Sequence, residues 1–167
     1  MQWIYRPEPE QSAVTELAAA LQVPPLVARL LVQRGITSFE QARLFFRPSL
    51  EDLHDPFLMR DMEAAVTRVE AALERGERIL VFGDYDVDGT TAVALMAGYL
   101  QTRGAALATY IPDRYTEGYG LSREGIDFAA DNEMGLIIAL DCGVKALDHA
   151  RYAASKGIDL IICDHHR

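Results

Sequence analysis

The sequence has 167 residues, of which 50% are hydrophobic and 25% charged, and its formal net charge is −9. These values are ordinary for a folded protein and leave room for one medium domain, or for a small domain beside part of a larger one. A simple DNA-binding module is usually basic, so the acidic balance argues against that class, but not against a nuclease whose metal site gathers carboxylates.

No stretch approaches the roughly 20 consecutive apolar residues that a membrane helix needs. The first residues lack a basic region followed by an apolar core, so no signal peptide is expected. Cys142 and Cys163 do not make a disulfide framework and are expected to be small packing residues. We therefore expect a cytoplasmic protein.

Residues 1–60 are expected to form a small helical N-terminal extension. Proline turns separate three short helical patterns, and Ser38 with Gln41 has the spacing of a capping box. Residues 47–60 are expected to be an ordered connector with apolar anchors. The expected helices run from a cap at Ser12 to about Leu21, from Pro25 to a stop at Gly35, and from Ser38 to about Phe46.

From residue 61 onward, apolar strands alternate with helical patterns. Such alternation implies crossover connections and a parallel sheet, and the all-apolar strands agree because a parallel sheet is covered on both faces. The fold class is therefore α/β, with residues 61–167 as the parallel-sheet domain. Strands are expected at 78–83, 106–111, 135–140 and 159–163, with helices at about 62–75, 90–103, 122–132 and 146–156.

Three of the four expected strands end in acidic residues. The carboxyl ends of parallel strands lie on one edge of a sheet, where open α/β proteins bind ligands, so these side chains are expected to converge. In chain order they are Asp84, Asp86 and Asp88 after the first strand, Asp141 after the third, and Asp164, His165 and His166 after the fourth.

Carboxylates that converge without partners repel one another and raise their own pKa values. Divalent cations resolve this conflict, and oxygen ligands with one or two imidazoles suit Mn²⁺ or Mg²⁺. Two such ions about 3.5–4 Å apart are the usual device for phosphodiester hydrolysis. The spacing of Asp84, Asp86 and Asp88 is expected to bring alternate side chains to one side of an extended turn, with Gly89 turning sharply into the next helix.

Two rival interpretations of the acidic run are weaker. A calcium EF-hand loop needs a glutamate at its twelfth position, where Leu95 stands, and a preceding helix where a strand is expected. The run 86–90 also resembles the first motif of haloacid-dehalogenase-type phosphatases. In that family the first aspartate comes directly off the strand, whereas Asp84 and Tyr85 intervene here, and the Asp-His-His run stays unexplained.

The segment 111–122 follows the second expected strand and therefore lies on the same edge. Arg114 could grip a phosphate, and Tyr115 or Tyr119 could stack on a base or sugar. The alternative is an ordinary glycine-rich loop. The histidines outside any motif are expected to have surface or packing roles, and they are His54 and His149.

Taken together, these motifs resemble the DHH phosphoesterase superfamily. Asp86-Val-Asp88, Asp141 and Asp164-His165-His166 match its first three motifs in order. The resemblance implies a metal-dependent enzyme that degrades single-stranded DNA in the 5′-to-3′ direction during repair and recombination. Similarity to bacterial single-strand DNA exonucleases of that superfamily covers essentially the whole chain, and the runs 54–66, 83–92, 111–122 and 139–143 carry it.

The resemblance also implies a role for each site residue. For two Mn²⁺ or Mg²⁺ ions, Asp86 and Asp88 would each hold one ion, Asp141 would bridge them, His165 would complete one sphere, and Asp84 would support the other. The implied catalytic residues are Asp164 and His166, with His166 contacting the scissile phosphate or assisting as an acid. Arg114 would bind the DNA backbone.

Exonucleases of this type continue beyond the Asp-His-His motif with a fourth aspartate motif, a second catalytic domain and an OB-fold. The sequence contains none of these, so we expect an N-terminal fragment, truncated after that motif, that is not a processive exonuclease by itself. Single-stranded DNA is the implied substrate, and a RecQ-type helicase and single-strand binding protein are the implied partners. The alternatives are another DHH enzyme, such as an oligoribonuclease or cyclic-dinucleotide phosphodiesterase, and a catalytically dead nucleic-acid-binding module.

Overall fold

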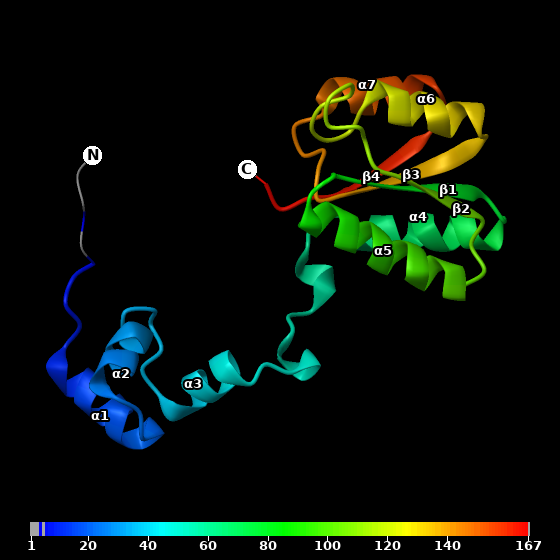
Figure 1. Ribbon diagram of the computed structural model, residues 1–167. Coiled ribbons are helices and arrows are strands. Elements are labelled where there is room, and N and C mark those ends of the chain that lie inside the picture. Colours follow the sequence, from blue (N-terminus) through cyan, green and yellow to red (C-terminus); the bar gives the residue numbers. More distant parts are fainter. Residues whose placement is uncertain (1–3, 5, 167) are drawn as a thin grey trace. The chain divides into compact units, whose positions relative to one another are not determined.

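The computed structural model describes residue 4 and residues 6–166. The chain divides into two compact units, Met1–Leu58 and Met59–Arg167 (Figure 1). Each unit buries hydrophobic residues of its own. The expected boundary after residue 60 lies close to this division, and the assignment of two separate domains stays a prediction.

The first unit consists of short helices and a connector. Its helices are α1 (Gln11–Leu21), α2 (Pro25–Val32) and α3 (Phe39–Phe46), and two 3-10 turns follow, η1 (Leu50–Asp52) and η2 (Pro56–Leu58). Val14 and Leu17 of α1 pack with Ala28 and Leu31 of α2 to form a small buried core. The two helices therefore pack against each other through these four residues.

Two of the three predicted helix starts in this unit are confirmed. Pro25 occupies the first helical position of α2, and Ser38 with Gln41 forms the capping box at the start of α3. The predicted cap at Ser12 is wrong, because Glu10 is the N-cap and its backbone carbonyl accepts a hydrogen bond from the Val14 N–H at 3.2 Å. Ser12 therefore lies inside the first turn, not before it.

The second unit is built on a four-stranded parallel sheet, which confirms the expected α/β class. Its strands are β1 (Arg78–Gly83), β2 (Leu107–Tyr110), β3 (Met134–Leu140) and β4 (Asp159–Cys163), in the order β2-β1-β3-β4. Every pair of neighbouring strands is parallel. This order leaves β1 and β3 in the centre, where their residues are almost completely buried.

Two pairs of helices cover the two faces of this sheet (Figure 1). One face packs against α4 (Met62–Glu74) and α5 (Val87–Thr102), and the other against α6 (Arg123–Asp131) and α7 (Leu147–Ser155). In β1, Ile79 and Val81 face the first pair, whereas Leu80 and Phe82 face the second. Because successive strand residues point to opposite faces, this double coverage explains why the strand is apolar along its length.

The start of α5 differs from the expectation. The helix begins at Val87, three residues earlier than predicted, because the Asp86 side chain accepts a hydrogen bond from the Gly89 N–H at 2.9 Å and so caps it. Asp88 therefore lies in the first helical turn, and the expected extended turn through Asp84, Asp86 and Asp88 is wrong. The sequence pattern predicts Asp86 only as a metal ligand, whereas an aspartate can be an N-cap and a metal ligand at once.

Among the described residues, no single helix is both long and apolar enough to cross a membrane. The helices α1 and α2 pass that test only as a pair, by length and composition, and they are bent by 118° at the break between them. Part of their apolar residues packs into the core of the first unit, whereas Leu26 and Leu30 are exposed.

Candidate metal centre

The pairing of the strands brings three of the aspartates to neighbouring positions. Gly83 of β1 pairs with Leu140 of β3, and Leu140 pairs with Cys163 of β4. The next residue on each strand is an aspartate, so Asp84, Asp141 and Asp164 follow one another across the end of the sheet. We name this edge, with the loops that follow the three strands, the acidic rim. The backbone N–H of Asp141 donates to the Cys163 carbonyl at 2.8 Å, which continues the pairing to the rim.

Asp84 is the most unusual of these residues. Its side chain is fully buried, and neither carboxylate oxygen has a hydrogen-bond partner among the described residues. Leaving a buried carboxylate unpaired is costly, so buried charges in proteins are normally paired or coordinate metals. This carboxylate therefore fits a cation that would supply the missing partner.

Gly89 allows the first turn of α5 to approach the Asp84 backbone. A Cβ atom at position 89 would lie 2.5 Å from the Asp84 carbonyl oxygen and 2.6 Å from its nitrogen. The glycine thus brings the amino end of α5, with its partial positive charge, against the acidic rim. Asp86 and Asp88, both exposed, lie at that end of the helix.

The second and third acidic loops meet directly. The ligand atoms offered by Asp141, His165 and His166 all lie within 4.8 Å of one another. The closest recorded pair joins His165 Nε2 and Asp141 Oδ1 at 3.1 Å. Asp141 has a φ of 60°, in the left-handed region, where aspartate is tolerated better than most residues. These loops can therefore contribute oxygen and imidazole nitrogen to a common centre.

Asp164 performs a different task from the other aspartates. Its two oxygens accept hydrogen bonds from the Val144 N–H at 2.9 Å and the His166 N–H at 3.0 Å, and Oδ1 lies 2.7 Å from His166 Nδ1. Burial raises the pKa of Asp164, but the hydrogen bonds from Val144 and His166 outweigh it and bring the pKa below its ordinary value. The hydrogen bond with Asp164 in turn raises the pKa of His166 above its ordinary value. Asp164 therefore orients His166, leaving Nε2 as the free ring nitrogen.

Cys142 lies beneath the same rim. The thiol is buried and free, and its pKa is raised to about 12, first by burial and then by Asp84, Asp164 and Asp141. Such a thiol is protonated and unreactive at neutral pH. This agrees with its predicted packing role, and the three carboxylates all act on the thiol from nearby.

The segment from Ile111 to Ser122, which we name the rim loop, lies over this edge. Its Arg114 guanidinium lies 4.9 Å from the centre of the Tyr85 ring, and Tyr119 meets Tyr85 and His166 edge-on with centroids 6.1 Å apart. The Tyr119 hydroxyl also donates to the Asp141 carbonyl at 3.4 Å. Arg114 and Tyr119 are thus brought to the acidic rim, whereas Tyr115 is 93% exposed and makes no recorded aromatic contact among the described residues.

One contributor to this region has no predicted role. Tyr85 contacts both Arg114 and Tyr119. His149, for which a surface or packing role is expected, lines a small groove of about 260 Å³ together with His166 and Tyr119, which is compatible with that role.

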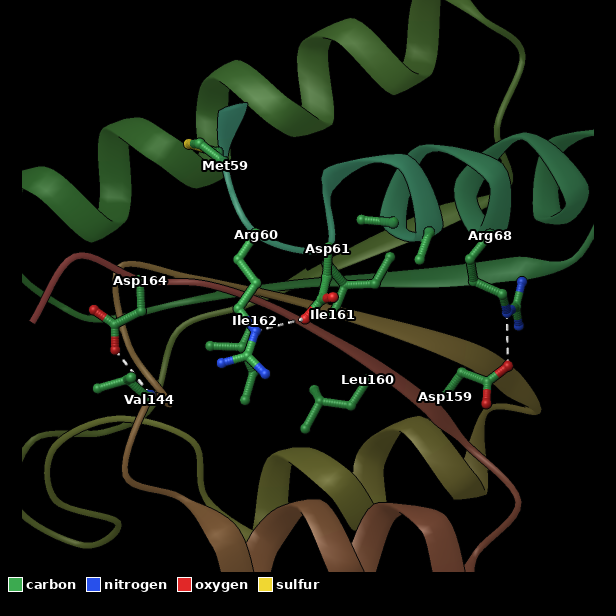
Figure 2. Close-up of a pocket in the computed structure, with 12 residues that line it drawn as sticks. Met59, Arg60, Asp61, Arg68, Val144, Asp159, Leu160, Ile161, Ile162 and Asp164 are labelled. Atoms are coloured by element: carbon green, nitrogen blue, oxygen red, sulfur yellow. Dashed lines mark hydrogen bonds and ion pairs between the residues drawn. The ribbon is translucent and has the colours of Figure 1, made fainter. Parts of the chain in front are cut away.

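A larger hollow of about 850 Å³ runs along β4 and the start of α4 (Figure 2). Its wall is apolar in the middle, where Leu160, Ile161 and Ile162 line it. Figure 2 shows Asp164 bound to Val144 at one end and Arg68 paired with Asp159 at the other. The hollow meets the acidic rim only at Asp164, and none of the expected metal ligands lines it.

Comparison with protein families gives a specific match. The model of the DHH family, N-terminal domain, matches residues 78–167, which include all three acidic loops. RecJ of Bacillus subtilis, a single-stranded-DNA-specific exonuclease, is 40% identical over 166 residues, covering 99% of this chain and 21% of that protein. The corresponding RecJ of Escherichia coli is 34% identical, covering 87% of this chain and 25% of that protein.

Solved structures agree with these relatives. A crystal structure of RecJ from Thermus thermophilus in complex with Mn²⁺ superposes with a TM-score of 0.73 at 28% identity, covering 96% of this chain and 22% of that one. A structure of exonuclease RecJ bound to manganese superposes with a TM-score of 0.61 at 34% identity, covering 65% and 28%. The chain thus spans about a fifth to a quarter of the length of the curated relatives it matches.

Proposed function

The chain belongs to the DHH family, and from that membership we propose that it carries the metal-binding part of a single-stranded-DNA exonuclease. The proposed reaction is hydrolysis of phosphodiester bonds in the 5′-to-3′ direction, in DNA repair and recombination. The proposed cofactor is a pair of Mn²⁺ or Mg²⁺ ions, in keeping with the ions bound in the solved RecJ structures.

The observation that supports this proposal best is the buried, unpartnered carboxylate of Asp84 at the rim where Asp141, His165 and His166 meet. A stabilising network of hydrogen bonds would have provided partners for Asp84, as it does for Asp164. A carboxylate that is buried without a partner among the described residues fits a centre completed by a cation.

In this proposal, the ligands of the two ions are Asp84, Asp86, Asp88, Asp141 and His165. Asp141 is the proposed bridge, supported by its central position between the other two acidic loops. The chemistry that divalent ions supply at such a site is activation of water and neutralisation of charge on the phosphoryl oxygens. The amino end of α5 adds partial positive charge on the same side.

His166 and Asp164 are the proposed catalytic pair. Asp164 holds Nδ1 of His166 at 2.7 Å, so a proton carried on Nε2 points away from the carboxylate. The raised pKa of His166 favours its protonated form, which suits contact with the scissile phosphate or donation to the leaving oxygen. Arg114 and Tyr119 would bind the DNA backbone and stack on a base or sugar. Tyr115, which lies outside this cluster, is the weakest of the proposed contacts.

Substrate and partners belong to the proposal as well. Single-stranded DNA is supported by the described activity of the curated relatives. A RecQ-type helicase and single-strand binding protein rest on family resemblance alone. A cytoplasmic location would give the chain access to DNA, and the two free cysteines are compatible with it.

A chimera tests the proposal. The segment of Bacillus subtilis RecJ that aligns with this chain would be replaced by the chain, and 5′-labelled and 3′-labelled single-stranded DNA would be digested with Mn²⁺. We expect Mn²⁺-dependent release from the 5′ end, and a loss of activity of roughly a hundredfold or more on Asp141→Asn, because the proposed bridge is lost.

The same chimera distinguishes the alternatives. Cleavage of dinucleotides without degradation of long DNA would instead favour an oligoribonuclease or cyclic-dinucleotide phosphodiesterase. A chimera that folds and binds DNA but hydrolyses nothing would favour a catalytically dead binding module. Either result would contradict the proposed exonuclease.

A further inference from the structure

The rim loop, 111–122, contains two acidic residues, Asp113 and Glu117. The side chain of Glu117 forms hydrogen bonds both within the loop and to the residues at its two ends. We propose that this residue, Glu117, is a positioning residue that holds Arg114 and Tyr119 in place for the phosphate backbone of a single strand. The inference rests on the proposed function, and it assigns a role that neither the acidic motifs nor their spacing indicates.

Glu117 accepts hydrogen bonds from three separate parts of the chain. One oxygen, Oε2, accepts from the Tyr110 hydroxyl at 2.9 Å and from the Ser122 hydroxyl at 2.6 Å. The other oxygen, Oε1, accepts from the Asp113 N–H at 2.8 Å. These donors lie at the end of β2, at the start of α6 and in the first turn of the rim loop, so one carboxylate ties together both ends of the loop and its middle.

The outer anchors of this network are fixed in the core. Tyr110 stacks on Phe82, a fully buried residue of β1, with ring centroids 5.4 Å apart and an interplanar angle of 12°. Ser122 is 5% exposed, and its hydroxyl also accepts from the Gly125 N–H at 3.0 Å as the N-cap of α6. Glu117 therefore connects the rim loop to groups whose positions are set by packing.

A second set of bonds shapes the part of the loop that carries Arg114. Asp113 Oδ1 accepts from the N–H groups of Tyr115 and Thr116, both at 2.9 Å. The Glu117 N–H donates to the Asp113 carbonyl at 2.9 Å. Arg114 lies inside this closed turn, and its free end rests over Tyr85. Fixing the turn therefore limits where the guanidinium can be.

Glu117 also positions Tyr119, which follows the closed turn in the sequence. Gly118 and Gly120 flank it with φ values of 86° and 84°, conformations that glycine adopts without strain. Glu117 immediately precedes this Gly-Tyr-Gly run, so its carboxylate fixes the point from which the run leaves the closed turn. The Tyr119 hydroxyl then reaches the Asp141 carbonyl.

The charge of Glu117 strengthens the inference. An acidic side chain in a loop that faces an anionic strand would weaken binding by repulsion, unless nearby groups stabilise its charge. Three hydrogen-bond donors stabilise the charge of Glu117, whose side chain is half-buried whereas Arg114 is exposed. A carboxylate held in this way fits a loop that must keep one conformation before the substrate arrives.

The test is a double-mutant cycle in the full chain between Glu117→Ala and Arg114→Ala. Binding of a phosphorothioate-protected single-stranded oligonucleotide with Mn²⁺ is measured by fluorescence anisotropy, well below the thermal midpoint of every variant. We expect Glu117→Ala to raise Kd about tenfold, but about twofold or less when Arg114 is already alanine. Glu117→Gln keeps the shape but only one of the two acceptor oxygens, so it should restore part of the affinity.

Two controls separate positioning from general instability. Glu124→Ala removes an exposed carboxylate from the first turn of α6 that forms no side-chain hydrogen bond among the described residues, and it should leave Kd unchanged. Amide hydrogen exchange should quicken at 113–118 in Glu117→Ala and stay slow in β3. Mn²⁺ affinity measured by calorimetry should be the same as in the wild type.

The outcomes are distinct. Additive effects of Glu117→Ala and Arg114→Ala, or an unchanged Kd with unchanged exchange in the rim loop, would overturn the positioning role and leave the proposed function standing. A wild-type chain that shows no Mn²⁺-dependent binding of the oligonucleotide would overturn the proposed function, and the role of Glu117 would fall with it.

Discussion

At the scale of single residues, the aspartates of the rim show how environment assigns different tasks to one side chain. Asp84 is buried without a partner among the described residues, the buried side chain of Asp164 is hydrogen-bonded, and Asp88 is exposed at a helix start. The sequence predicts that these residues converge, because their loops all follow strands. It does not predict their separate roles, since these depend on which backbone N–H groups happen to face each carboxylate.

Asp84→Asn should separate stability from metal binding. The substitution removes a buried negative charge that has no hydrogen-bond partner among the described residues, so the metal-free protein should gain roughly 1–2 kcal/mol in its free energy of unfolding. Mn²⁺ affinity should fall at least tenfold. Urea unfolding in chelator and calorimetric titration with Mn²⁺ measure the two effects. A variant that is less stable without metal would show that the carboxylate already has a stabilising partner.

Glu117 should give the rim loop a dependence on acidic pH. Burial raises the pKa of Glu117, but the hydrogen bonds from Asp113, Ser122 and Tyr110 outweigh it, and its pKa lies below the ordinary value of 4.5. A depressed pKa in the folded state stabilises the protein above the unfolded pKa, and this contribution is lost as pH falls through the folded pKa. The protection of amides 113–118 against exchange, relative to their intrinsic rates, should therefore fall below about pH 4.5. Glu117→Gln keeps one acceptor oxygen and does not titrate, so its protection should be intermediate at neutral pH and should change less with pH, with Asp113 as the remaining titrating group of the loop. A parallel response of both proteins would contradict this.

At the scale of elements, the strands are the part of the fold that the sequence predicts best. β1, β3 and β4 lie within a residue of their expected bounds, because runs covered on both faces must be apolar throughout. The starts of α1 and α5 were missed for a shared reason. Each helix start depends on a local hydrogen bond, from the Val14 N–H to the Glu10 carbonyl in α1 and from the Gly89 N–H to the Asp86 side chain in α5. Several polar residues in each run could have been the N-cap, so the pattern alone does not identify the start.

Two glycines on α5 should respond to alanine in opposite directions. Gly89→Ala would place a Cβ atom 2.5 Å from the Asp84 carbonyl, so the helix start must shift, at a cost of about 1–3 kcal/mol or more. Gly98→Ala meets nothing within 4 Å and should stabilise the protein by about 0.5–1 kcal/mol, since alanine favours the helix. Urea unfolding of both variants provides the comparison, and equal changes in the two would argue against the close approach of α5 to the rim.

At the scale of the whole molecule, the net charge of −9 and the proposed function are compatible because five of the 25 acidic residues gather where cations can bind. The order of the strands explains how this happens. Three loops that are distant in sequence end at neighbouring positions of one sheet edge, and the sequence predicts that edge from the alternation of strands and helices. The hydrogen bonds of the rim loop could not be predicted, because the run 111–122 predicts only a loop at the sheet edge, and Tyr110, Glu117 and Ser122 meet only through the fold.

The central claim is that residues from three separate loops form one centre for divalent ions. Calorimetric titration of the chain with Mn²⁺ tests it most directly, using Asp84→Asn, Asp141→Asn and His165→Gln, with Asp148→Asn in the exposed first turn of α7 as the control. We predict at least tenfold weaker binding in each of the first three variants and wild-type affinity in the control. Wild-type Mn²⁺ affinity in all three rim variants, or no Mn²⁺ binding by the wild type, would contradict the account.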